Sequence, residues 1–267
     1  MRAILVSRYP RVDTPEWKRR VADGLLAAGV EVGVLYSQAR LIDQARAGLR
    51  EEGLAVTRRY LKLRRGGPSD ATPAQSLADW ARERGLRVEG TARLEADALR
   101  ELEPDIAVLV GADIVPAPVL QVPRIATINA HYALLPAYRG MNVTEWSVLR
   151  GDPVGVTVHV VDRGVDTGDI LVREEIPIEP GETFATLRRK HQDVAARLLV
   201  DAALQLRDGT ATRRPQAPGD GRQYYRMHPA LRRRAEKALA AQASGAEGAR
   251  SSTARSAAAA STSPSAT

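Results

Sequence analysis

The sequence contains no cysteine, so disulfide bonds, thiolate catalysis and cysteine-based metal sites are all excluded. Aromatic residues make up only 4% of the chain, which leaves few platforms on which nucleic acid bases could stack. No apolar run approaches the roughly 20 residues that a membrane-spanning helix needs. The N-terminal segment lacks the parts of a secretory signal. These absences predict a cytoplasmic protein without a membrane partner.

The positive charge of the chain limits the classes of partner that we expect it to bind. The 267 residues carry a formal net charge of +7, and almost all of the basic residues are arginine. Basic side chains of this kind can bind a nucleic acid, bind an anionic small molecule, or simply be solvated at the surface. Solvated arginine on an enzyme is the favoured interpretation, an anionic small molecule comes second, and we do not expect a nucleic acid partner.

The chain opens with alternating strand and helix patterns. The apolar runs Arg2–Val6 and Val30–Tyr36 predict strands, separated by a helix that Thr14-Pro15 begins and Gly29 ends. Ile106–Val110 is a continuous apolar run, typical of a central strand buried on both faces. This order predicts an α/β fold with a mostly parallel central sheet flanked by helices.

Later segments complete this pattern. Further strands are predicted at Leu86–Val88, Arg124–Asn129, Val154–Asp162 and Asp169–Ile178, and helices at 72–84, 96–102 and 183–206. We therefore expect a catalytic domain over 1–207 and a short C-terminal extension over 208–241, with one short helix inside Gln223–Ala240. The Ala/Ser/Thr/Gly-rich segment 242–267 predicts a disordered tail.

An arginine-rich stretch, Leu41–Gly67, interrupts the alternation. It is interpreted either as a helix with a solvated basic face or as a lid that binds an anion, and both interpretations stay open.

Four polar side chains lie on or after the strands in an order that suits group-transfer chemistry. Asn129 and His131 lie two positions apart at the end of a strand, so their side chains share a face. His159 lies on the polar face of the strand Val154–Asp162, and Asp166 lies in a glycine-bracketed turn. An amide, an imidazole and a carboxylate together can stabilise negative charge and move a proton. No spacing matches a zinc site, so we predict no metal.

The motifs stand in the order Asn129-Ala130-His131, Leu134-Leu135-Pro136, Tyr138-Arg139-Gly140, Gly155-Val156-Thr157, His159 and Gly164-Val165-Asp166-Thr167-Gly168. In this order they resemble the folate-dependent formyltransferase family, which includes the methionyl-tRNA, glycinamide ribonucleotide and sugar N-formyltransferases. The resemblance covers roughly residues 106–206. Tyr132-Ala133 departs from the family, which usually has Pro or Gly and then Ser there, so this pocket wall is expected to differ.

The resemblance implies a Rossmann-like formyltransferase domain with 10-formyltetrahydrofolate as co-substrate. Asn129 would donate a hydrogen bond to the formyl oxygen as it gains negative charge, and losing such a donor costs about 3 to 4 kcal/mol of barrier. His131 would donate to the same oxygen or move a proton. Asp166 would hold the His131 tautomer and favour its protonated form.

The resemblance also assigns binding residues. The pterin ring is expected between two loops, at Gly111, Ala112, Asp113, Ile114, Val161, Asp162, Gly164 and Val165. The acceptor side is assigned to Arg139, Gly140, Met141, Asn142, Trp146 and His159. Trp146 suits core packing equally well. His191 and His228 are predicted to lie on helix surfaces.

The predicted acceptor is a small-molecule amine, either a nucleotide-linked amino sugar or an amine of specialised metabolism. The segment after Leu206 is short for the second, RNA-contacting domain of a methionyl-tRNA formyltransferase, and the basic stretch Arg58–Arg65 could meet a diphosphate. The alternatives are a 10-formyltetrahydrofolate hydrolase, methionyl-tRNA formyltransferase-like activity, a binding protein that lost catalysis, and a non-catalytic basic RNA-binding module. A homodimer is compatible with the sequence, which does not identify the acceptor or the pathway.

Overall fold

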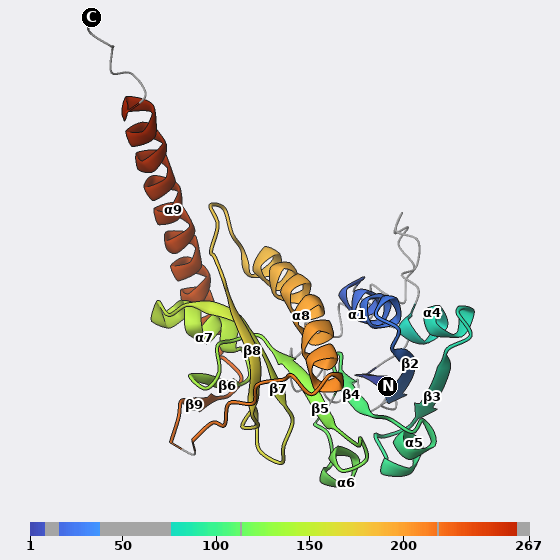
Figure 1. Ribbon diagram of the computed structural model, residues 1–267. Coiled ribbons are helices and arrows are strands. Elements are labelled where there is room, and N and C mark those ends of the chain that lie inside the picture. Colours follow the sequence, from blue (N-terminus) through green and yellow to red (C-terminus); the bar gives the residue numbers. More distant parts are fainter. Residues whose placement is uncertain (9–15, 38–75, 113, 218, 261–267) are drawn as a thin grey trace, which may run out of the picture. The chain divides into compact units, whose positions relative to one another are not determined.

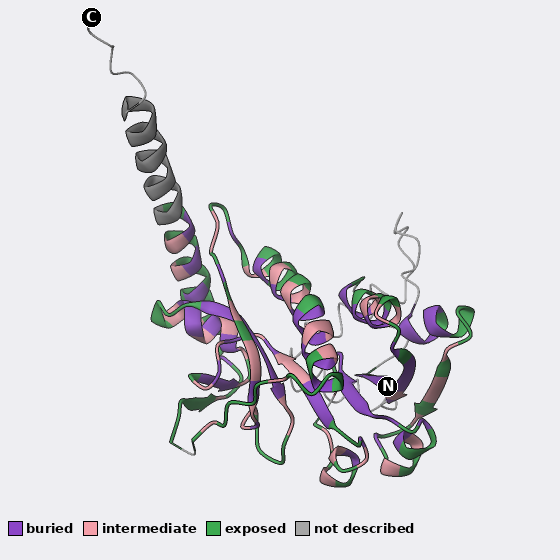
Figure 2. Ribbon diagram, in the orientation of Figure 1, coloured by how far each residue is buried: buried purple, intermediate pink, exposed green. Residues whose placement is uncertain are grey.

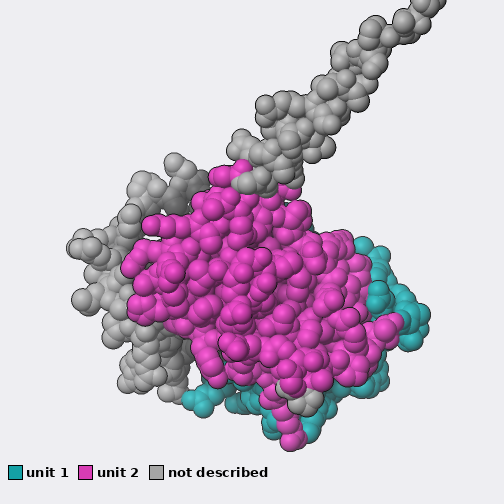
Figure 3. Space-filling model, turned by 90° about the vertical axis from the view of Figure 1, so that its left-hand side faces the viewer, with its two compact units in different colours: residues 1–129, 203–210 teal, residues 130–202, 211–267 magenta. Residues whose placement is uncertain are grey.

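The computed structural model describes residues 1–8, 16–37, 76–112, 114–217 and 219–260, with only the backbone for 245–260. The chain divides into two compact units, residues 1–129 with 203–210 and residues 130–202 with 211–267 (Figure 3). The basic stretch Leu41–Gly67, the helix start Thr14-Pro15 and the candidate binding residue Asp113 lie outside the described residues. The division into 1–207, 208–241 and 242–267 stays a prediction.

The first unit alternates strands and helices, as the opening of the sequence predicts (Figure 1). Its strands run in the order β3-β2-β1-β4-β5, and each neighbouring pair is parallel. In chain order the described elements are β1 (Arg2–Arg8), α1 (Glu16–Ala27), β2 (Glu31–Ser37), α4 (Leu77–Glu83), β3 (Arg87–Thr91), α5 (Ala96–Glu101), β4 (Ile106–Leu109), α6 (Ala117–Leu120) and β5 (Ala126–His131).

Burial in this unit follows the apolar patterns of the sequence (Figure 2). All four residues of β4 are buried, because the strand lies between β1 and β5 in the sheet. Helix α1 buries Trp17, Val21 and Leu25, which lie on one face at helical spacing. β4 and β5 end at Leu109 and His131, at or next to candidate site residues.

The second unit holds an antiparallel strand pair, a small parallel pair and three helices. β7 and β8 are antiparallel and continue the sheet order after β5, giving seven strands in all. β6 pairs in parallel with β9. The described elements are β6 (Tyr138–Gly140), α7 (Val143–Arg150), β7 (Val154–Val160), β8 (Ile170–Ile176), α8 (Phe184–Arg207), β9 (Arg222–Tyr224) and α9 (Pro229–Ala260). The mostly parallel, Rossmann-like sheet with flanking helices is thereby confirmed.

The C-terminal segment differs from the prediction at its start. Arg222–Tyr224 is a strand and not the start of a helix, because its backbone pairs with β6. The helix begins at Pro229, whose fixed φ suits a first helical position. Its backbone is helical to Ala260, and disorder over 242–267 stays a prediction.

Helix α8 shows a second departure, at His191. The side chain is fully buried, although it was predicted to lie on the surface. His191 lies four residues from both Leu187 and Ala195, so it belongs to the buried stripe of the helix. No helix among the described residues is long and apolar enough to cross a membrane.

Strand β5 offers a direct test of this packing. Ile128 is fully buried, whereas Ile125, just before the strand, is 37% exposed. We expect Ile128→Ala to lower the free energy of unfolding by about 2 to 5 kcal/mol, because it leaves a cavity in the sheet core. The matched control Ile125→Ala should lower it by less than about 0.5 kcal/mol. Equal losses in urea titrations of the two variants would contradict the buried position of Ile128.

Candidate active site

His131 is the last residue of β5 and its ring is buried, with 7% of the side chain exposed. Asn129 precedes it by two positions on the same strand, so the two side chains leave the same face of the strand. The Nε2 atom of His131 lies 2.8 Å from the carbonyl oxygen of Tyr138. A carbonyl only accepts, so Nε2 must carry the hydrogen in this contact.

The loop between β7 and β8 carries Asp166 in a left-handed conformation, with φ of 53°. Two features shape the loop. The Oδ1 atom of Asp162 accepts hydrogen bonds from the Gly164 amide at 3.0 Å and from the Thr167 hydroxyl at 2.7 Å. Gly168 packs against the backbone of Val160 so closely that a Cβ atom would clash with the carbonyl oxygen. These contacts fix the backbone of the glycine-bracketed turn that carries Asp166.

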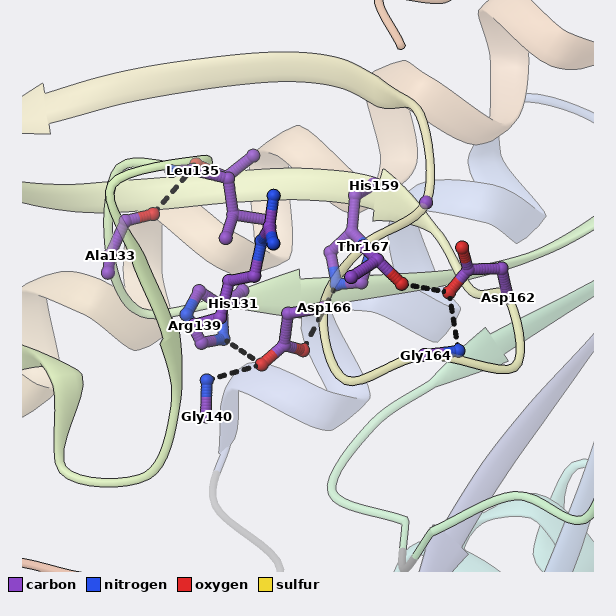
Figure 4. Close-up of polar contacts among 12 residues, drawn as sticks. His131, Ala133, Leu135, Arg139, Gly140, His159, Asp162, Gly164, Asp166 and Thr167 are labelled. Atoms are coloured by element: carbon purple, nitrogen blue, oxygen red, sulfur yellow. Dashed lines mark hydrogen bonds and ion pairs between the residues drawn. The ribbon is translucent and has the colours of Figure 1, made fainter. Parts of the chain in front are cut away.

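Asp166 is the point where the site residues converge (Figure 4). Its Oδ2 atom accepts a hydrogen bond from the Gly140 amide at 2.8 Å and lies 3.4 Å from Nδ1 of His131. Its Oδ1 atom lies 3.5 Å from Nε2 of His159. Burial raises the pKa of Asp166, but the hydrogen bond from His159, the electrostatic interaction with His131 and the Gly140 amide lower it overall to about 2. The carboxylate is therefore ionised at neutral pH.

The ring of His131 faces an oxygen acceptor at each nitrogen. The Tyr138 carbonyl faces Nε2 and the Asp166 carboxylate faces Nδ1, so these neighbours favour a second proton. Burial opposes it, and together with His159 it lowers the pKa of His131 below its ordinary value. Asp166 therefore favours the protonated ring, as expected, but desolvation outweighs the pull of the carboxylate in the resting site.

His159 was assigned to the site from its place on a polar strand face, and it contacts Asp166 from β7. Its side chain is 2% exposed, and its Nδ1 atom lies 2.8 Å from the Val160 carbonyl oxygen. The rings of His131 and His159 stand edge to face, with centroids 6.3 Å apart. Among the described residues no group of three or more His, Asp or Glu side chains is placed to hold a metal ion.

Thr157 braces the loop that follows His131. Its hydroxyl donates to the Ala133 carbonyl at 2.7 Å and accepts from the Leu135 amide at 3.0 Å. Arg173 of β8 donates to the Leu135 carbonyl at 3.0 Å. The motif threonine therefore ties β7 to the segment that leads from His131 to Gly140.

Gln216 is a site residue that the sequence analysis missed. Its Nε2 atom donates to the carbonyl oxygens of Asp166 at 3.1 Å and Gly168 at 2.6 Å. Its Oε1 atom lies 3.4 Å from both Nε and Nη2 of Arg139. One amide thus connects the aspartate loop to the motif arginine. Gln216 falls in an irregular segment far along the chain, where periodicity carries no signal.

The residues assigned to the acceptor side mostly hold the C-terminal segment. The Asn142 side chain accepts a hydrogen bond from the Met227 amide at 3.1 Å, and the Trp146 indole donates to the Tyr225 carbonyl at 3.0 Å. Trp146 also packs against the cluster of Ala133, Tyr138 and Val143, which favours the packing interpretation of that residue. Met141 is 49% exposed, and its role as an acceptor contact stays a prediction.

The residues assigned to the cofactor lie in two loops. Gly111, with φ of 83°, and Ala112 follow β4 in the first unit, and Ile114 there is 94% exposed. Val161, Asp162, Gly164 and Val165 lie in the β7–β8 loop of the second unit. Asp162 braces its own loop, as described above, and Val165 is 44% exposed. Binding of a pterin ring by these residues stays a prediction.

The low pKa of Asp166 links folding to pH. The ordinary aspartate value is 3.8 and the folded value is about 2, so the stability that the ionised group contributes is fully present above about pH 4. It is lost as the pH falls through about 2. The shift corresponds to roughly 2 kcal/mol, and Asp166→Asn removes this dependence.

Unfolding titrations of the two proteins between about pH 5 and pH 2 measure the difference. The wild type should lose stability more steeply with acid than Asp166→Asn, whereas Asp23→Asn, at an exposed position of α1, should follow the wild type. Parallel curves for the wild type and Asp166→Asn would contradict the ionised state of this buried carboxyl group.

Gln216 should contribute to stability through its amide. Gln216→Ala leaves two carbonyl oxygens without their donor, and we expect a loss of about 1 to 3 kcal/mol in the free energy of unfolding. Gln216→Glu should lose at least as much, although it keeps an oxygen toward Arg139, because a carboxylate cannot donate to carbonyls. Gln223→Ala, at an exposed position of β9, is the control. A harmless Gln216→Glu would show that the Arg139 contact alone matters.

Comparison with known proteins places these features in context. A methionyl-tRNA formyltransferase from Synechococcus sp. (strain JA-3-3Ab) is 38% identical over 143 residues, covering 51% of this chain and 44% of that protein. One from Parvibaculum lavamentivorans is 32% identical over 219 residues, covering 80% and 63%. The chain spans about half the length of the first curated relatives that it matches.

Solved structures share the fold. An N-formyltransferase from Helicobacter canadensis, in complex with folinic acid and dTDP-3-aminofucose, has a TM-score of 0.57 at 15% identity, covering 90% of this chain and 80% of that chain. Glycinamide ribonucleotide transformylase 1 from Symbiobacterium toebii has a TM-score of 0.55 at 20% identity, covering 78% and 88%. The family model described as formyl transferase matches residues 39–203, more than half of the chain and the whole span of the site motifs. The chain therefore belongs to the formyl transferase family, whose members are formyl-transferring enzymes.

Proposed function

We propose that the protein transfers a formyl group from 10-formyltetrahydrofolate to a primary amine of a small molecule. The observation that carries the proposal is the ionised carboxylate of Asp166, held by His131, His159 and the Gly140 amide. His131 follows Asn129 by two positions on β5. Family membership and the folinic acid in a structural relative support a folate as the formyl donor.

The residues present suit this co-substrate, which supplies a formyl group on nitrogen when bound. As an amine attacks that carbon, negative charge develops on the formyl oxygen. Asn129, two positions before the end of β5, has a side-chain amide that can donate to such an oxygen. The buried surroundings of His131 strengthen electrostatic interactions at this end of the strand.

The proton that the amine loses needs an acceptor. Of the three converging side chains, Asp166 is the most exposed, at 16%, against 7% for His131 and 2% for His159. The carboxylate therefore meets the attacking amine, and the histidines lie behind it. His131 is neutral in the resting site and can take up the proton, because the Tyr138 carbonyl and Asp166 then accept from both ring nitrogens. As the bond between the formyl carbon and the folate nitrogen breaks, this proton would pass to the departing nitrogen.

A small acceptor is supported by the position of the C-terminal segment, which lies against the loops of the site. β9 pairs with β6 beside Gly140, and Gln216 contacts both Arg139 and the Asp166 loop. Gly140 has no room for a side chain, because a Cβ atom would clash with the Tyr224 carbonyl oxygen. A wall built by the chain so close to Asp166 favours a compact amine. A nucleotide-linked amino sugar is the finer proposal, and the cytoplasm is the proposed location.

The second candidate acceptor is methionyl-tRNA. It is favoured by the sequence relatives, which are methionyl-tRNA formyltransferases at 38% and 32% identity. The same chemistry at Asn129, His131 and Asp166 serves both acceptors, so only the acceptor side distinguishes them.

A direct assay tests the proposal. The purified protein receives 10-formyltetrahydrofolate with a panel of amino sugars, nucleotide-linked amino sugars or methionyl-tRNA, and formylated product is measured by mass. We expect turnover of a small amine. Asn129→Ala should lower kcat by about 100- to 1,000-fold, because one oxyanion donor is lost.

The controls separate the alternatives. Gln223→Ala should keep full activity, and the folate affinity of Asn129→Ala should stay close to that of the wild type. Formylation of methionyl-tRNA alone would replace the small acceptor with the second candidate. Formate release without any amine would indicate a hydrolase, and no turnover of the folate at all would overturn the proposal.

A further inference from the structure

A hollow of about 350 Å³ lies between α8 and α9 in the second unit. Such a volume falls within the roughly 300 to 1,000 Å³ typical of small-molecule sites. Its walls combine three guanidinium groups with one aromatic ring and one amide, and the lining residues are Phe184, Ala185, Arg188, Arg189, Gln192 and Arg232. The arginines are exposed and come from two different helices.

The positive charge of the three arginines that line this hollow is only partly neutralised by acidic side chains. Within the described part of the chain, the structure assigns one ion pair to the three arginines, between Nε of Arg232 and Oε1 of Glu236 at 3.8 Å. Lys190, the next residue along α8, pairs with Glu182. Three guanidinium groups around one space repel one another, and a bound anion relieves that repulsion. Guanidinium groups match phosphate oxygens with paired N–H donors.

A second, smaller cavity adjoins the hollow, because Phe184 and Arg188 line both. It holds about 20 Å³ and is also lined by Tyr132, Thr144, Glu145 and His191. A space of this size takes one water molecule or one hydroxyl group. The arginine-lined hollow and the small polar cavity therefore lie side by side, and the small cavity is called the floor below.

His191 gives the floor its chemistry. The residue is fully buried, and its Nδ1 atom donates to the Leu187 carbonyl at 2.7 Å. Burial lowers the pKa of His191, so the ring is neutral and Nε2 is left as an acceptor. This Nε2 atom has no hydrogen-bond partner among the described residues. A buried acceptor without a donor is costly, which calls for an O–H or N–H group in the cavity beside it.

We propose that this hollow binds a small phosphate ester that carries a hydroxyl group, such as a sugar phosphate or a nucleoside phosphate. The arginines hold the phosphate, Phe184 covers the apolar face of the ligand, and a hydroxyl group donates to Nε2 of His191. The inference goes beyond formyl transfer and does not depend on it, since none of these residues belongs to the Asp166 cluster.

Calorimetric titration of the full chain at low salt tests the site, with ribose 5-phosphate and inorganic phosphate as probes. We expect saturable binding of both, with ribose 5-phosphate the tighter. Arg232→Ala should weaken binding by about tenfold, because one charge-assisted contact is lost. Arg233→Ala is the matched control, since it removes the same charge from the next position of α9 and Arg233 does not line the hollow.

A second pair of variants tests the floor. His191→Leu should bring the affinity for ribose 5-phosphate down to that for inorganic phosphate. If that variant fails to fold, Arg188→Ala at the exposed rim should weaken both ligands alike. Absence of saturable binding, or equal weakening by Arg232→Ala and Arg233→Ala, would overturn the proposal. Binding of a single-stranded RNA but of neither small probe would also overturn it and would assign the surface to nucleic acid.

Discussion

The buried carboxylate of Asp166 requires polar partners from several elements of the second unit. A buried charge without partners costs several kcal/mol, so polar groups must be brought to it from distant parts of the chain. The Gly140 amide, His131 and His159 come from β6, β5 and β7, and Gln216 holds the carbonyl oxygens of the loop itself. Each contact depends on a strand end or loop being in register. The ionised aspartate is therefore both a chemical group and a constraint on the fold around it.

That constraint explains how the C-terminal segment is used. Trp146 and Asn142 hold the backbone of Tyr225 and Met227, and β9 pairs with β6. The segment that begins after α8 thus forms part of the wall beside the aspartate loop. Some of the side chains that the family resemblance assigns to the acceptor, namely Trp146 and Asn142, instead hold this segment in place. The identity of the amine consequently depends on the few groups that stay exposed, among them Met141.

Two buried histidines of this unit show how partners decide what a side chain does. Burial lowers the pKa of both His131 and His191, so both rings are neutral at rest. His131 faces acceptors at both nitrogens, which prepares it to gain a proton. The Nδ1 atom of His191 donates to a carbonyl, and its Nε2 atom has no hydrogen-bond partner among the described residues. Nε2 can therefore accept a hydrogen bond. The first arrangement suits proton transfer and the second suits the recognition of a donor.

The local sequence pattern was sufficient to predict the strands β1, β2, β4 and β7 and the apolar stripe of α8 through Leu187. It also predicted the order of Asn129, His159 and Asp166 along the chain. Each of these features depends on residues close in sequence. The pairing of β9 with β6, the bridge through Gln216 and the burial of His191 join residues far apart in the chain, and no periodicity records them. The protonation of His131 belongs to the same class. Sequence placed a carboxylate near an imidazole, but desolvation depends on everything packed around the ring, and only the tertiary structure decides that.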